Sequence, residues 1–329
     1  MKKTLIALAA LAATSAFAQV TITGTFDPSI AASNTTYNTA AGDQSLSQNF
    51  VRNNSQGTSQ ITFKGVEDLG GGMSAMFLYE GDFTSAAGAS AANSIGGGGG
   101  EIYTALSGGF GTVKLGAPNT PSLTVQAARQ PFGTKIGSGF GGVLGTSHVR
   151  EDNSLNYTSP VFAGGLTAAV NYTFGTNVAA PGTNVNAKTD IGLIYAAGPL
   201  FAGVSFYKQD GTNQQTNMAL SYDFGMAKVM FGVHNETATV AGVDNQSSGT
   251  NLGVAVPFGK ITLLANVAQL DDKSAANLDK TISGIGARYD LSKRTSVYGR
   301  YVAEKNDNVV AANGIKAVNT TLVGVQHNF

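Results

Sequence analysis

One stretch of this sequence carries positive side chains without any negative ones. It runs from Lys114 to Glu151 without an intervening Asp or Glu, and its cationic or basic residues are Arg129, Lys135, His148 and Arg150. Cations grouped on one segment attract small anions. The competing interpretation places Arg129 and Lys135 on a loop surface, where they are only solvated. The chemistry that this pattern favours is ion attraction.

Other patterns that could carry chemistry have simpler explanations. The run GGGGGE at 96–101 lacks the following Lys-Ser/Thr of a phosphate-binding loop and fits an external loop. The histidines are far apart, and there is no HExxH or GxSxG motif. Cysteine is absent, which excludes disulfides, thiol catalysis and Cys-type zinc sites. Asp271, Asp272 and Asp307 fit solvated or divalent-bridging loop acids. We therefore expect no catalytic residue, no metal site and no cofactor.

The N-terminal segment MKKTLIALAALAATSAFAQ has the three parts of a secretory signal peptide. Lys2 and Lys3 precede an apolar run, and Ala16-Phe17-Ala18 forms an A-x-A cleavage site. The run is shorter than the roughly 20 apolar residues that a membrane-spanning helix needs. Cleavage after Ala18 would leave 329 − 18 = 311 residues, so we expect residues 1–18 to be the signal peptide and 19–329 the mature domain.

Composition excludes several classes of protein. Removing Lys2 and Lys3 from the 20 basic residues leaves 18 against 20 acidic ones, a nearly neutral chain that does not indicate nucleic-acid binding. Charged residues make up only 12% of the chain and glycine contributes 43 residues, which differs from an ordinary charged-surface globule. After the N-terminal segment there is no run of 18 apolar residues. An apolar surface must therefore be assembled from short segments.

Those short segments show period-two alternation. In VTITGTFDPSI (20–30) the even positions carry no polar side chain and the odd positions are polar, and LTAAVNYTF (166–174) and TNMALSYDF (216–224) alternate in the same way. Each segment predicts a strand with one apolar and one polar face. We predict sixteen strands, at 20–33, 59–69, 73–83, 101–109, 110–118, 151–162, 166–175, 188–198, 200–209, 215–225, 227–237, 247–258, 260–271, 279–292, 295–306 and 318–329.

Short and long connections alternate between these strands. The short ones contain GG, GP, GM or LSKR, and the long ones are expected at 34–58, 84–100, 119–150, 176–187, 238–246 and 307–317. Short turns on one side and long loops on the other are typical of a transmembrane antiparallel β-barrel with an even strand number. A secreted β-sandwich or β-solenoid would also alternate, but the sequence has no fixed repeat period, and aromatic residues lie near many strand ends. A closed barrel must pair its last strand with its first. Thr321, Val323, Val325, His327 and Phe329 would then face lipid.

Several motifs resemble the trimeric general diffusion porins of Gram-negative bacteria, of the betaproteobacterial and neisserial type. Ser59 to Phe83 looks like the second and third strands of that family, and the FKGVEDLGGG and LSKRTSVYGRY blocks are the most specific matches. LSGGFGTVKLG (106–116), REDNSLNYTSPVFAGG (150–165) and the closing VGVQHNF (323–329) follow in order, so the resemblance covers essentially the whole mature chain.

The resemblance implies a sixteen-stranded outer-membrane barrel that assembles as a homotrimer and passes ions and small hydrophilic solutes by diffusion. Its surroundings would be outer-membrane lipid and lipopolysaccharide. The third long loop, about 117–149 here, would fold into the pore and narrow it. Phe329 resembles the terminal residue that the outer-membrane insertion machinery reads.

The sequence departs from that family at the pore wall. Relatives commonly carry arginine or lysine at three motif positions that here read Gln60, Ala117 and Asn156. Alternation places Gln60 and Asn156 on the polar face, whereas Ala117 is ambiguous. We hypothesise that Arg129 and Lys135, with the wall residues Lys64 and Arg150, set a weak anion preference.

Two other functions stay open at this point. One is an outer-membrane hydrolase with a Ser-His pair on the outer wall, for which His234 and His327 are the strand histidines. The other is a non-channel adhesin or structural barrel, although a long glycine-rich loop suits a pore constriction better.

Overall fold

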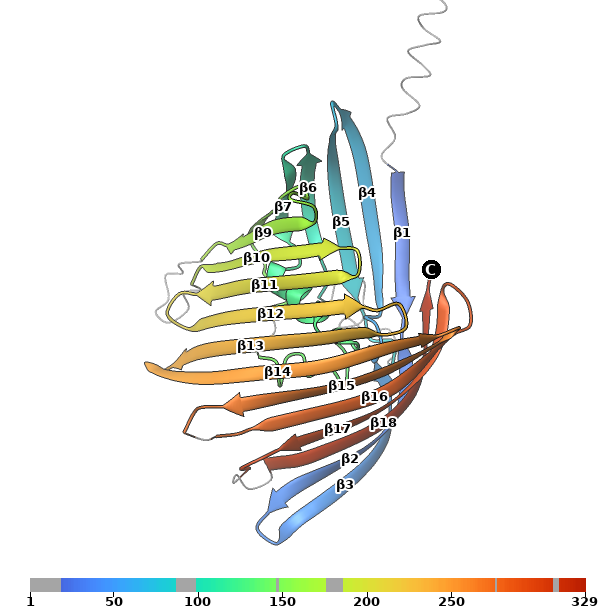
Figure 1. Ribbon diagram of the computed structural model, residues 1–329, viewed down its shortest axis with the longest axis vertical. Coiled ribbons are helices and arrows are strands. Elements are labelled where there is room, and N and C mark those ends of the chain that lie inside the picture. The colour runs from blue at the N-terminus through green and yellow to red at the C-terminus, as the bar shows by residue number, and fades with distance from the viewer. Residues whose placement is uncertain (1–18, 87–98, 146–147, 176–185, 276, 310–313) are drawn as a thin grey trace, which may run out of the picture.

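The computed structural model describes residues 19–86, 99–145, 148–175, 186–275, 277–309 and 314–329. Within them, one antiparallel sheet curves into a closed barrel (Figure 1). The segments before its long internal loop are β1 (Gln19–Phe26), β2 (Pro28–Thr39), β3 (Gly42–Asn53), β4 (Gln60–Gly70), β5 (Met73–Asp82), β6 (Ile102–Gly108) and β7 (Gly111–Ala117). After that loop come β8 (Ser154–Thr158), β9 (Leu166–Thr173), β10 (Lys188–Ala197), β11 (Leu200–Gln209), β12 (Asn213–Asp223), β13 (Lys228–Val240), β14 (Val243–Phe258), β15 (Ile261–Asp272), β16 (Lys280–Asp290), β17 (Thr295–Asn306) and β18 (Gly314–Asn328). The loop itself holds a helix, α2 (Pro121–Ala128).

These eighteen segments make sixteen barrel strands, which confirms the predicted fold. The first barrel strand is β1 followed by β2, and the second is β3 followed by β4, because β2 pairs with β3 and β1 pairs with β4. The two halves of this pairing meet at Asp27. Residues 54–59 of the second strand stand opposite this one residue and form a six-residue excursion, which we call the excursion (54–59).

The buried carboxylate of Asp27 holds the excursion in place. It accepts hydrogen bonds from the backbone N–H groups of Gln56 (2.6 Å) and Gly57 (2.8 Å) and from the Tyr298 hydroxyl. Asp27 has no exposed surface, and its own N–H donates to the Ser59 hydroxyl (3.1 Å). Backbone N–H groups that have no partner in the strand ladder at this interruption therefore form hydrogen bonds with side chains.

The barrel closes between its two ends, as the sequence predicts. β18 pairs with β2 and, through Thr25 and Phe26, with β1. Phe329 exchanges two backbone hydrogen bonds with Gly24, at 3.1 and 3.2 Å. A Cβ atom on Gly24 would lie 2.4 Å from the Phe329 ring, so the glycine makes room for the last residue.

The outward face is apolar across the barrel, because the predicted alternation holds on strand after strand. Val323 on β18 is 65% exposed while Leu322 beside it is 1% exposed. Thr321, Val325, His327 and Phe329 are also exposed, as expected for the predicted outward face. None of the helices within the described residues is long and apolar enough to cross a membrane.

Four predicted boundaries are wrong. Residues 34–58 were expected to be a loop but contain half of β2 and all of β3. β13 and β14 meet at a two-residue turn (241–242) inside the expected loop 238–246, and β18 begins at Gly314 inside the expected loop 307–317. The second half of β2 and most of β3 carry polar side chains on both faces, so they lack the alternation that reveals a half-buried strand. The end of β13 does alternate, with Ala238 and Val240 between threonines, and was missed. The strand expected at 151–162 is limited to Ser154–Thr158. The predicted signal peptide (1–18) lies outside the described residues.

Replacing Asp27 by alanine is expected to lower the free energy of unfolding by about 3 kcal/mol, because two partly buried N–H groups and the buried Tyr298 hydroxyl lose their acceptor. Urea unfolding of the protein refolded in detergent micelles measures this. The control is Asp43→Ala, which breaks an exposed ion pair with Lys316 (2.8 Å) and should cost less than about 1 kcal/mol. Equal losses for the two variants would contradict the role given to Asp27.

Candidate functional site

The long loop between β7 and β8 folds into the barrel, and we call residues 118–150 the inward loop. Its helix α2 begins after Thr120, whose hydroxyl accepts a hydrogen bond from the Leu123 N–H (3.2 Å), and Pro121 occupies the first helical turn. Both features favour a helix start at this point. α2 lies against β10, β11 and β12, so one side of the barrel interior is covered from within.

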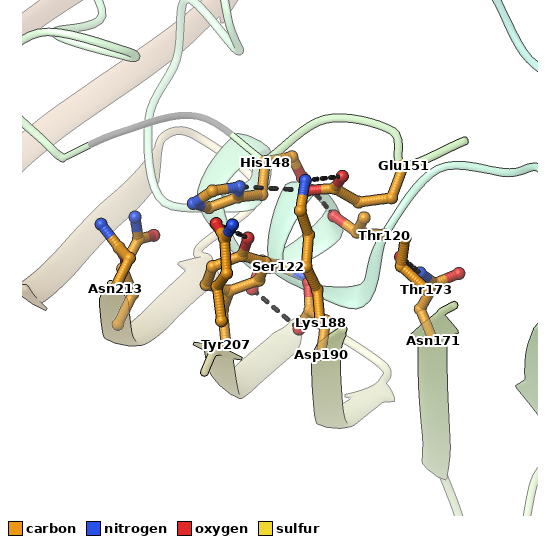
Figure 2. Close-up of polar contacts among 12 residues, drawn as sticks. Thr120, Ser122, His148, Glu151, Asn171, Thr173, Lys188, Asp190, Tyr207 and Asn213 are labelled. Atoms are coloured by element: carbon orange, nitrogen blue, oxygen red, sulfur yellow. Dashed lines mark hydrogen bonds and ion pairs between the residues drawn. The ribbon is translucent and has the colours of Figure 1, made fainter. Parts of the chain in front are cut away.

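The beginning of α2 is fixed to the wall by Asp190 on β10 (Figure 2). The Asp190 carboxylate accepts hydrogen bonds from the Ser122 N–H (3.1 Å) and the Ser122 hydroxyl (2.9 Å), and Ser122 also contacts the Ser205 hydroxyl (3.0 Å). All three side chains are buried. A buried carboxylate with hydrogen-bond donors from the loop fixes the loop's position as well as its sequence register on the wall.

The end of the inward loop returns to the same place (Figure 2). The His148 ring stacks on Tyr207 at a centroid distance of 3.5 Å, and its Nδ1 lies 3.2 Å from the Glu151 carboxylate. Lys188 pairs with the other oxygen of Glu151. Burial alone would raise the pKa of Glu151, but hydrogen bonds from His148 and Lys188 lower it below its ordinary value. The Thr120 hydroxyl donates to the His148 carbonyl, which joins the two ends of the loop.

Arg129 is held between the loop and the wall and does not reach the open lumen. It has no exposed surface, and its guanidinium donates to the Leu144 carbonyl (3.0 Å), the Val233 carbonyl (3.2 Å) and the Asn217 side chain (3.4 Å). Burial lowers the pKa of Arg129 to about 9, so the group is still charged at neutral pH. The hypothesis that Arg129 faces passing ions is therefore corrected: the side chain fastens the loop.

The rest of the loop crosses the inner wall toward β17. Arg300 donates to the Ile136 carbonyl (3.0 Å) and to the Ser55 carbonyl of the excursion, and its guanidinium lies 4.7 Å from the Phe132 ring centre. An apolar cluster completes the contact, and its buried members are Val143, Leu144, Ala268, Ile282 and Val302. Apolar side chains on the lumen side of β15, β16 and β17 thus pack against the loop and are not exposed to water.

Gly145 shows how closely the loop approaches the wall. Its φ is +79°, and a Cβ there would lie 1.7 Å from the His234 ring. His234 is fully buried and hydrogen-bonded to Asn217 (2.7 Å) and Glu236 (3.3 Å). This position is incompatible with a catalytic histidine on the outer wall. His327 does face outward, and it pairs with the Thr295 hydroxyl (2.9 Å).

Charged side chains of both signs meet at the excursion and the neighbouring wall. Lys135 on the loop donates to the Thr58 hydroxyl (2.6 Å). Burial lowers the pKa of Lys135, and the nearby carboxylates of Asp82 and Asp27 partly offset this. Arg150 lies 3.4 Å from Asp82. The structure therefore brings Lys135 and Arg150 to one acidic stretch of wall.

The sequence analysis did not identify this acidic stretch, which consists of Glu80, Asp82 and Glu101. Glu80 accepts a hydrogen bond from Gln60 (2.6 Å), and Glu101 accepts one from the Asn119 N–H (2.7 Å). With Asp82 they place three carboxylates on β5 and just before β6. The sequence could have indicated it, because alternation with the outward residues Phe77 and Tyr79 places Glu80 and Asp82 on the lumen face of β5.

The other predicted wall residues are spread along the lumen. Gln60 lies beside Glu80, and Lys64 lines a separate hollow of about 420 Å³ with Thr21, Thr23 and Thr62. Asn156 is only 2% exposed and donates to Asn171 (3.3 Å), so it belongs to the wall's own hydrogen bonds. Ala117 is the last residue of β7 and pairs with Ile102.

Comparisons with known proteins agree with this architecture. The family model described as Gram-negative porin matches residues 4–309. Over 100% of both chains, the sequence is 31% identical to outer membrane porin protein 32 of Delftia acidovorans and 27% identical to an outer membrane porin protein of Bordetella pertussis. The anion-selective porin from Comamonas acidovorans superposes with a TM-score of 0.79 and 26% identity, covering 95% of this chain and 100% of that one. A loop-deletion form of OmpT from Vibrio cholerae shares the fold at a TM-score of 0.68 and 13% identity, covering 94% and 99% of the two chains.

Replacing Arg129 by methionine is expected to loosen the inward loop without opening the barrel. Three hydrogen bonds are lost, so amide hydrogen exchange across 122–145 should accelerate roughly tenfold or more, while β15 to β17 exchange as before. Mass spectrometry of the exchanged peptides measures both regions. Lys135→Met is the control, since it removes the same charge but only one hydrogen bond to a side chain. Similar exchange in the two variants would contradict the fastening role.

Proposed function

The chain belongs to the Gram-negative porin family, and we propose that it is a weakly charge-selective member whose inward loop sets the passage. It is an outer-membrane diffusion channel, and its family consists of channel proteins rather than enzymes. Such a barrel lets ions and small hydrophilic solutes cross down their own gradients.

The observation that carries the proposal is the mixture of charges beside the loop. Lys135 and Arg150 favour anions, whereas Glu80, Asp82 and Glu101 favour cations, and Arg150 and Asp82 lie within ion-pair distance. Opposite charges a few ångströms apart largely cancel at the distance of an ion passing in water. The net field in the passage is then small, and selectivity is weak.

Substitutions on the wall support the same conclusion. Relatives with cations at the three motif positions concentrate positive charge there, and the similar structure from Comamonas acidovorans is described as anion-selective. Here those positions hold Gln60, Ala117 and Asn156, so the positive charge left for anions is that of Lys135, Arg150 and Lys64. A weaker anion preference than in such relatives follows.

Assembly and surroundings follow from the family. We expect a homotrimer in the outer membrane, in contact with lipid and lipopolysaccharide, exported with residues 1–18 as a signal peptide. We also expect the insertion machinery to read Phe329. Its fixed position against Gly24 in the closed barrel supports a second, structural use of this residue after insertion.

Reconstitution of the purified protein into a planar lipid bilayer tests the function. Stepwise conductance increases are expected, grouped in threes for a trimer, with a small zero-current potential under a potassium chloride gradient. Folded protein that gives no steps would contradict a channel. Single, ungrouped steps would contradict the trimer alone.

Two neutralising variants test the charge balance in the same bilayer. Lys135→Gln should move the zero-current potential toward cation preference, and Glu80→Gln should move it toward anion preference, because each removes one side of the balance. Lys208→Gln is the control, since its side chain is 61% exposed and paired with Asp210 on the outside. An unchanged potential in both test variants would show that the passing ions do not sense this cluster.

A further inference from the structure

A hollow of about 550 Å³ lies at the end of the barrel where the connections are short. Two turns and the end of β18 form it: Gly259 and Lys260 between β14 and β15, and Leu291 to Arg294 between β16 and β17. Short turns lie on the periplasmic side of outer-membrane barrels. The hollow is therefore part of the periplasmic mouth.

Backbone hydrogen bonds fix the frame of this hollow. The Asp290 N–H donates to the Lys260 carbonyl (2.9 Å), and the Asn328 N–H donates to the Arg294 carbonyl (2.8 Å). The Ser292 hydroxyl accepts from the N–H groups of Arg294 (3.1 Å) and Thr295 (3.0 Å), which sets the shape of the second turn. Adjacent turns are thus held together although their side chains are exposed.

The hollow opens toward the lumen rather than toward lipid. Arg288 shares the face of β16 that holds Ile282 and Gly284, which contact the inward loop. Gln326 also lines the hollow, and its side chain accepts from Gln56 of the excursion (2.9 Å). Solutes that pass the excursion toward the periplasm therefore meet this hollow.

Its charge is strongly positive. The lining includes Lys260, Arg288, Lys293 and Arg294 against a single carboxylate, Asp290, which gives a net charge of 4 − 1 = +3. Asp290 pairs with Arg288 (3.0 Å). Among the described residues, Lys260, Lys293 and Arg294 form no ion pair with a carboxylate. Three cations thus line one hollow without an ion-pair partner, because Asp290 is paired with Arg288.

The opposite rim shows the reverse arrangement. A hollow of about 400 Å³ on the outer wall there is lined by the carboxylates of Asp271, Asp279 and Asp307, and of these Asp307 pairs with Lys305 (2.6 Å). The positive charge is therefore local to the hollow at 259–260 and 291–294, since other turns of the same rim carry Asp68 and Asp223 and the whole chain is nearly neutral.

We propose that the hollow lined by Lys260, Lys293 and Arg294 is a weak binding subsite for small multivalent anions of the phosphate class at the periplasmic mouth. The proposal rests on the proposed channel function, and it adds that anions bind at the periplasmic end of the channel and not at the other end. Because the hollow is wide and its cations are exposed, a hydrated anion enters without losing its water. Affinity is then on the order of millimolar and falls with ionic strength.

The test measures block of the channel's chloride current by inorganic phosphate, added to one chamber of a planar bilayer of neutral lipid at about 0.1 M salt. There the screening length is about 10 Å, against about 3 Å at 1 M. Phosphate on the periplasmic side should reduce the current, and phosphate on the other side should do so less. The chain has no cysteine, so a biotin on Met226→Cys, at an exposed turn of the same rim, reports the orientation through streptavidin.

The variant Lys260→Gln/Lys293→Gln/Arg294→Gln should raise the half-blocking phosphate concentration about tenfold, since a dianion loses three attractive charges. The matched control is Lys208→Gln/Lys305→Gln/Lys316→Gln, which removes the same charge from exposed ion pairs near the other rim. Its block should equal that of the original protein. Equal block in the original and the test variant would overturn the subsite.

Two further outcomes distinguish free phosphate from a lipid headgroup as the anion that binds in the hollow. If phosphate blocks in neutral lipid but loses its effect in a bilayer with anionic lipid at the same salt concentration, lipid headgroups reach the three cations, and the placement of the subsite in the lumen is overturned. If block persists in both lipids and fades at 1 M salt, the subsite stands. Absence of any conductance step would instead count against the channel function, whereas normal steps with symmetrical, unchanged block count only against the subsite.

Discussion

The need to pair every backbone polar group within the membrane governs this structure. Hydrocarbon offers no partner to an exposed N–H or C=O group, so strands cross it only as a closed sheet. Phe329 is the residue at which closure is completed, because its backbone pairs with Gly24 of the first strand. The one interruption of the ladder near that seam is compensated locally by the Asp27 carboxylate, which supplies acceptors where the strand does not. Closure thus depends on polar side chains as well as on the regular ladder.

A closed barrel of this size leaves an interior that must be partly filled if it is to discriminate among solutes. The inward loop does this with two kinds of contact. Buried polar groups such as Asp190 and Arg129 define where the loop lies, since each would be left without a partner in any other position. The apolar cluster around Leu144 then adds contact area. Arg129 shows that a cation on a pore loop need not act on passing ions, because its side chain is buried against the wall.

Charge is distributed unevenly along the barrel, although the chain as a whole is neutral. Cations and carboxylates lie close together near Lys135 and Asp82, whereas the hollow formed by the turns at 259–260 and 291–294 carries four cations and one carboxylate. Other turns of the same rim carry Asp68 and Asp223, so the positive charge is confined to that hollow. Net charge, which is the quantity most easily read from the sequence, does not describe either environment.

The sequence by itself determined the strand count, the outward faces and the pairing of the last strand with the first. Alternation encodes these features because one face of each strand meets lipid and the other meets water or the loop. It could not show β3, where most side chains on both faces are polar. Nor could it separate Arg129 from Lys135, two cations six residues apart on one loop. Only the tertiary structure decided that one is buried against Val233 and Leu144 and the other lies near Asp82, because a loop's side chains follow no period and their surroundings come from distant strands.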